Sequence, residues 1–99
     1  MNAISRIALT GMNAAQAQLG ASAHNIANAQ TPGFQRQEVD LSADPAGGVV
    51  ASARQASNAG ASLERDVVGQ LAAKHAFMAN LAVFKTADAT MGALLSIRG

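Results

Sequence analysis

Small and apolar residues recur every three or four positions through the first part of the chain. This spacing places them on one face of a helix, which we expect to run from about Ala3 to Asn28 over roughly 35 to 40 Å. Because most of these side chains are small, the helix can approach a neighbour closely. The stripe consists of Ile4, Ala8, Met12, Ala15, Leu19, Ser22 and Ile26.

A second periodic segment occupies the end of the chain. Ser62 is a good N-cap residue, and Glu64 and Asp66 would place negative charge in the first turn of a helix beginning there. The heptad repeat of coiled coils fits this segment, although Lys74 and Asp88 at heptad positions would weaken a simple dimer. The stripe is therefore expected to meet the N-terminal helix or other subunits. Over both helices the predicted coiled-coil seam comprises Ile4, Met12, Leu19, Val67, Leu71, Phe77, Leu81, Phe84, Met91 and Leu95.

The helical period is lost in residues 35–61. Alternation of polar and apolar residues over Gln37–Leu41 predicts a short strand, and Asp44–Gly48 predicts a turn or flexible linker. Two alternatives, a loop and a weak helix of alanine, remain for Ser52–Ser62. The expected fold is mainly α: two long terminal helices pair as an antiparallel or assembly-dependent coiled coil, joined by a short irregular or weakly β linker.

A turn sequence separates the first helix from this linker. Pro32 lacks a backbone N–H and disfavours helical geometry at the preceding residue, so the helix should stop near Gln30. Pro32 and Gly33 suit the central positions of a type II turn, which would fold Phe34 back towards the helix. Two asparagine side chains can bond to free backbone groups near the helix end: Asn25 and Asn28.

The run Ser22-Ala-His-Asn-Ile-Ala-Asn-Ala-Gln-Thr-Pro-Gly-Phe34 closely resembles the N-terminal signature of bacterial flagellar rod, hook and basal-body proteins. The segment Leu63–Ile97 is similar to the C-terminal helix of rod and hook proteins. The resemblance implies that the two terminal helices pair, and that such pairs pack around a central channel. It also implies roles in subunit packing for Asn25, Ile26, Asn28, Thr31, Pro32, Gly33 and Phe34.

Three parts follow from this resemblance. Residues 1–34 hold the N-terminal helix and its turn, residues 35–61 a flexible linker or short β region, and residues 62–99 the C-terminal helix. The linker is too short for the large β-rich domain that hook and distal rod proteins usually carry. The chain is therefore more similar to the short proximal rod proteins.

Composition narrows the possible functions. Of the 99 residues, 49% are hydrophobic but only three are aromatic, so the core should be thin and order should improve on packing with partners. The net charge is +1 and the cations are scattered, which disfavours nucleic-acid binding. Neither an uninterrupted apolar run for a membrane span nor a cleavable signal peptide is evident. We therefore expect no direct membrane insertion and export without cleavage.

Catalytic chemistry has little support in the sequence. His24 and His75 stand alone without cysteine, and Asp66 and Asp88 lie far apart on one predicted helix. Gly47-Gly48 lacks the lysine of a phosphate-binding loop. A non-enzyme with no metal, cofactor or small-molecule substrate is expected.

Three functional hypotheses remain. The first, implied by the resemblance, is a structural subunit of the periplasmic flagellar rod that assembles with itself and with other rod and hook proteins. The flagellar type III apparatus would export it. The second is a small adaptor or cap that binds a rod or hook end. The third, an amphipathic peptide on membrane surfaces, is disfavoured because neither helix has a lysine-rich face.

Overall fold

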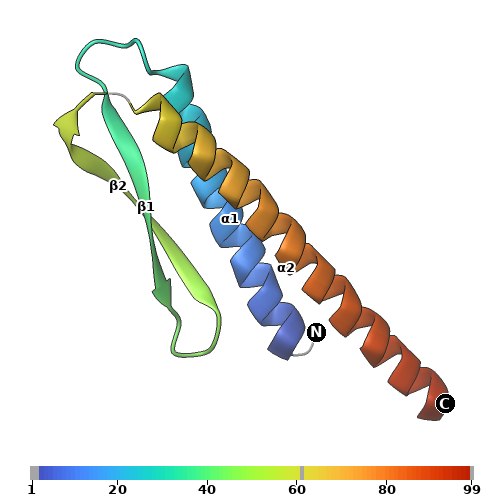
Figure 1. Ribbon diagram of the computed structural model, residues 1–99. Coiled ribbons are helices and arrows are strands. Elements are labelled where there is room, and N and C mark those ends of the chain that lie inside the picture. Colours follow the sequence, from blue (N-terminus) through green and yellow to red (C-terminus); the bar gives the residue numbers. More distant parts are fainter. Residues whose placement is uncertain (1–2, 61, 99) are drawn as a thin grey trace.

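The computed structural model describes residues 3–60 and 62–98, which form two long helices joined by a β-hairpin (Figure 1). In chain order these are α1 (Ala3–Ala27), β1 (Gln35–Ala43), β2 (Val49–Ala59) and α2 (Leu63–Arg98). The two helices run antiparallel, and α1 lies between the hairpin and α2. The molecule measures 62 × 25 × 13 Å. The predicted fold class, mainly α with two long terminal helices and a β linker, is confirmed.

The start of α2 agrees with the sequence prediction. The helix begins at Leu63, and the carbonyl of Ser62 accepts a hydrogen bond from the N–H of Asp66 at 3.0 Å. Glu64 and Asp66 both lie in the first turn. Carboxylates at this end of a helix are favourable because the free N–H groups and the helix dipole give it a partial positive charge.

The hairpin is the part of the chain that the sequence predicted least well. The strand expected over Gln37–Leu41 is confirmed within β1, but both alternatives for Ser52–Ser62 were wrong, because most of that segment belongs to β2. Backbone pairing decides this: Val39 lies opposite Ala53 and Leu41 opposite Ala51 in an antiparallel ladder. A strand next to a partner satisfies its backbone through the ladder, which overrides the weak helix preference of alanine.

The Asp44–Gly48 turn closes the hairpin. The N–H of Asp44 donates to Gly48 O at 3.0 Å, and the side chain of Asp44 accepts from Ala46 N–H at 2.9 Å. Gly47 and Gly48 have φ angles of 98° and 93°, which residues other than glycine rarely adopt. The glycines thus allow the chain to reverse here.

The two helices keep one antiparallel register along their length. A Cβ placed on Gly11 would lie 2.5 Å from the Asn80 side chain, and one on Gly69 would lie 3.3 Å from Ser22 Oγ. The Asn25 amide bonds to Asp66 in the same interface. In each of these three pairs the residue numbers add up to 91. The helices therefore meet at small residues, which let their backbones come close.

The core is thin, as the composition predicts. Among the residues whose burial the structure describes, the buried hydrophobic ones are all alanine apart from one methionine: Ala8, Met12, Ala14, Ala15, Ala21 and Ala73. No large side chain is fully buried among the described residues. The fold therefore gains little from burying large apolar groups, and its specific polar contacts carry more weight.

The predicted seam differs from the interface that the structure forms. Met12 is buried, and Phe77, Leu81 and Phe84 are half-buried. The other predicted seam residues are exposed: Ile4 58%, Leu19 38%, Val67 50%, Leu71 55%, Met91 40% and Leu95 62%. These residues therefore lie largely outside the contact between the two helices of one chain, and their place in a seam with other subunits stays a prediction.

The reason lies in how α2 is rotated about its axis. Asp66 and Ala73 are buried, and Asn80 is half-buried on the same side of the helix. The face that contacts α1 therefore includes Asp66 and Ala73, which each lie one residue before the predicted positions Val67 and Lys74. Small residues permit closer contact than the large apolar ones, and the contacts of Asp66 described below hold that residue inward.

The close approach of the helices at Gly11 yields a first prediction. We expect Gly11→Val to lower the free energy of unfolding by about 1 to 3 kcal/mol, because its side chain must displace Asn80. Gly20 is the matched control, since a Cβ there meets nothing within 4 Å. Gly20→Ala should raise stability by about 0.5 to 1 kcal/mol through helix propensity. Urea unfolding followed by circular dichroism measures both; equal effects would contradict the close contact.

α2 has the length and composition of a membrane-spanning helix, although the sequence lacks an uninterrupted apolar run. Over Leu63–Ser96 it is long and apolar enough to cross a membrane, with a hydropathy of 1.2, and only 6% of the segment tested is buried. Lys85 and Asp88 lie within this stretch. The same composition also suits a helix that packs against other helices.

Candidate functional site

The motif at the end of α1 forms a compact turn. α1 ends at Ala27, earlier than the predicted stop near Gln30, and the chain turns until β1 begins. The N–H of Phe34 donates to Thr31 O at 3.2 Å, and Gly33 has a φ of 71°. These features match the turn that the Pro32-Gly33 pair predicts, with glycine supplying the positive φ.

Phe34 folds back onto the helix that precedes the turn. Its ring centroid lies 5.4 Å from that of His24, with the planes tilted by 56°. Phe34 is half-buried, whereas Thr31, Pro32 and Gly33 are exposed. His24 is thus an aromatic packing partner, and the turn presents its central residues to solvent.

The two asparagines of the motif have different roles. Asn28 bonds locally, as predicted: its Nδ2 donates to His24 O at 2.9 Å and its Oδ1 accepts from Thr31 Oγ1 at 3.3 Å. Asn25 is 2% exposed and reaches away from the helix end instead. Its Oδ1 accepts from Gln37 N–H at 2.7 Å and its Nδ2 donates to Gln37 O at 2.9 Å. The Asn25 amide therefore holds β1 as a neighbouring strand would.

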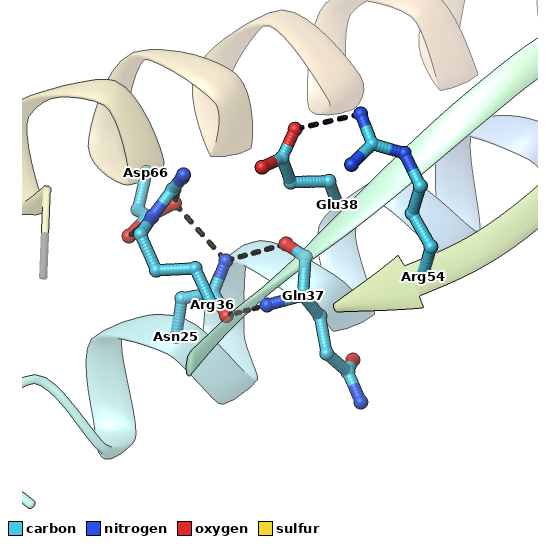
Figure 2. Close-up of polar contacts among 6 residues, drawn as sticks. All are labelled: Asn25, Arg36, Gln37, Glu38, Arg54 and Asp66. Atoms are coloured by element: carbon cyan, nitrogen blue, oxygen red, sulfur yellow. Dashed lines mark hydrogen bonds and ion pairs between the residues drawn. The ribbon is translucent and has the colours of Figure 1, made fainter. Parts of the chain in front are cut away.

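Asn25 also belongs to a buried polar cluster that joins three elements (Figure 2). Its Nδ2 donates to Asp66 Oδ1 on α2 at 3.2 Å. Arg36 on β1 donates from Nε to Asp66 Oδ2 at 3.3 Å and from Nη2 to Asp66 Oδ1. We call Asn25, Arg36, Gln37 and Asp66 the Asn25 cluster. It links the end of α1, the start of β1 and the first turn of α2.

Burial makes the ion pair in this cluster important. The side chains of Arg36 and Asp66 are 13% and 3% exposed. The hydrogen bond to Asp66 raises the pKa of Arg36, with a smaller opposing effect of burial. Arginine is charged at every physiological pH. The raised pKa therefore means that the ion pair stabilises the fold over that whole range.

A second ion-pair group lies on the hairpin. Arg54 on β2 donates to Asp40 Oδ2 at 2.7 Å and to Glu38 Oε2 at 3.1 Å across the strands. Figure 2 shows the Glu38 contact. Arg54 is about half exposed, so solvent screens these pairs and they add little stability.

The Asn25 cluster borders a cavity of about 270 Å³ where α1, β1 and α2 meet. Gln18 and Arg65 line it together with residues of the cluster. Among the residues described, no group of three or more His, Cys, Asp or Glu could hold a metal ion. The arrangement suits a structural joint, because its charged groups are already paired to one another.

Sequence reasoning recognised only part of this site. It placed Asn25 in the motif and Asp66 at the start of α2, but it missed Arg36 and Gln37 as their partners. Arg36 and Asp66 are thirty positions apart. Periodicity and short motifs carry no signal over that distance, so only the fold brings them together.

The comparisons agree with the motif. Residues 6–35 match the family described as flagella basal body rod protein, a segment that contains most of α1, the turn and the start of β1. None of the curated proteins compared with the chain matches it. The matched segment includes Asn25, the residue of the Asn25 cluster that contacts both β1 and α2. Residues 6–35 are therefore similar to the flagella basal body rod protein family, which supports a rod-type protein.

Proposed function

We propose that the chain is a structural subunit of the bacterial flagellar rod that assembles through its terminal helices. The family match supports a rod-type protein. The observation that carries the proposal further is the exposure of large apolar side chains on both helices. Side chains exposed by 52% to 66% include Ile4, Val68, Leu71, Met78 and Leu94. Extended apolar surface of this kind is typical of a protein that packs against others.

The partners in this proposal are copies of the chain and other rod and hook proteins. Export would use the flagellar type III apparatus without a cleavable signal, and the assembled protein would lie in the periplasmic rod. The predicted seam residues that are exposed in one chain, such as Val67, Leu71 and Leu95, would contact neighbouring subunits. The role is structural, with no catalytic step.

A tagged chain tests the location. The exposed Pro45-Ala46 tip of the hairpin accepts an epitope without touching the helix interface. We expect the tagged protein to be enriched in detergent-extracted basal bodies by immunoblotting. A motile strain whose basal bodies lack the tag would contradict the proposal.

Removing residues 89–98 tests the role of the α2 end. These residues extend past α1, so we expect the shortened chain to remain folded, with its circular dichroism signal reduced only by the ten helical residues removed. It should nevertheless fail to enter basal bodies, because it lacks apolar contacts to neighbours. Normal incorporation of the shortened chain would show that this end is not needed for assembly.

The adaptor or cap remains a second candidate because only a hairpin separates the two helices. A cap has no need of a large outer domain. Quantitative mass spectrometry of basal bodies distinguishes the two functions. More copies per basal body than a single ring contains would support a rod section. A number of copies no greater than one ring at a rod end would support a cap.

A further inference from the structure

α2 is much longer than the helix against which it packs. In the register set by Gly11 with Asn80 and by Asn25 with Asp66, Ala3 at the start of α1 lies opposite Asp88. Residues 89–98 of α2 therefore extend past α1 by about 15 Å. Figure 1 shows this extension at the C-terminal end of α2.

An apolar groove lies where α1 stops. It has a volume of about 440 Å³ and is lined by Ile4 of α1 and by α2 residues that include Val83, Ala87, Met91 and Leu94. None of its lining residues is charged. Ile4 and Leu94 are 58% and 52% exposed, so nothing in the described chain covers the groove.

The α2 face of this groove is complementary to itself. Val83, Ala87, Thr90 and Leu94 follow one another at intervals of four, three and four residues, as on one face of a helix. When two copies of this face meet antiparallel, Leu94 of one lies beside Val83 of the other. Ala87 then lies beside Thr90, so the smaller residues meet at the centre. This arrangement allows close helix packing.

We propose that the groove binds the same segment of a second copy, forming a closed antiparallel dimer of the free chain. Each copy's α2 would lie along the groove of the other and continue the interface between α1 and α2. Such a two-fold contact uses the same patch on both copies and does not propagate. The dimer therefore concerns the free chain before assembly. Its test does not depend on the proposed rod function.

Charge favours a second copy over a lipid surface. Lys85 and Asp88 lie on the side of α2 away from the groove, where both are exposed. One cation and one anion give that side no net charge, whereas helices that lie on membrane surfaces have a lysine- or arginine-rich polar face. In the dimer both stay in water while the uncharged faces come together.

Cysteine cross-linking tests the arrangement directly, because the chain has no cysteine of its own. Copies carrying Ala87→Cys, mixed with tagged copies carrying Thr90→Cys, should form a mixed disulfide under mild oxidation. Its yield should be several-fold above that of either variant alone, since each residue faces the other type. Leu71→Cys, on another exposed face of α2, is the control and should cross-link weakly. Equal yields at all three positions would overturn the proposal.

Sedimentation equilibrium provides a second, independent test. The unmodified chain should sediment as a dimer and Leu94→Asp as a monomer with unchanged circular dichroism, while Leu71→Asp should remain dimeric. A monomeric unmodified chain, or a ladder of larger species, would overturn the closed dimer. Binding of a monomeric chain to phosphatidylcholine vesicles, lost in Leu94→Asp, would assign the groove to lipid instead.

Discussion

Replacing Asp66 by alanine is expected to lower the free energy of unfolding by about 3 kcal/mol. Arg36 is only 13% exposed, so the change would leave its charge largely buried without a counter-ion. It would also remove an acceptor from Asn25 Nδ2. In a thin core of alanine, such a loss is a large share of the total stability. Urea unfolding measures it.

Glu64 is the matched control for this change. It lies in the same first turn of α2 but is exposed, so Glu64→Ala loses only a favourable interaction with the helix dipole. We expect a cost below about 1 kcal/mol. If both alanine variants were equally destabilised, the helix dipole and not the buried ion pair would explain the role of Asp66.

A substitution of Asp66 should also have an effect at a distance. Asp66 is on α2, yet its partner Arg36 is on β1, so Asp66→Asn should also increase hydrogen exchange in the hairpin. In a double-mutant cycle, Arg36→Met and Asp66→Asn should cost much less together than the sum of the single changes. Faster exchange confined to α2 would show that the cluster does not couple the hairpin to the helix.

Asn25→Ala is the second change with a large expected effect. It removes three hydrogen bonds and leaves the N–H and C=O of Gln37 without their partner in a half-buried position. Each unsatisfied group costs about 1 to 3 kcal/mol, and a total loss of about 3 kcal/mol is expected. Thermal unfolding and hydrogen exchange at Gln37 measure the effect.

Asn28→Ala controls for the loss of a motif asparagine. Asn28 bonds only within the helix end and the turn, and it is half-buried, so its loss should cost about 1 kcal/mol or less. A larger cost for Asn28→Ala than for Asn25→Ala would mean that the turn, rather than the joint with β1 and α2, governs stability.

Local sequence was sufficient for the elements whose causes are local. The heptad-like spacing predicted both helices, Ser62 and the acidic residues after it predicted the start of α2, and Pro32-Gly33 predicted the turn. Each of these depends on neighbours a few residues away. The motif at the end of α1 was enough to indicate the flagellar rod family, which the match over residues 6–35 supports.

The part that sequence left open depends on contacts between distant segments. Residues of β2 have weak preferences of their own, and only the ladder with β1 makes them a strand. Heptad spacing placed large apolar residues such as Val67 and Leu71 in the seam. It could not show that close contacts at Gly11 and Gly69 turn the Asp66–Ala73 face inward.

By itself, the sequence determined two helices, the turn between α1 and β1, a thin core and the resemblance to rod proteins, because periodicity, capping and composition act within a few residues. The tertiary structure decided the helix register, the strand β2 and the pairing of Arg36 with Asp66. These depend on which surfaces fit closely and on which buried polar groups find partners. Such partners lie tens of residues apart, so they become neighbours only when the chain is folded.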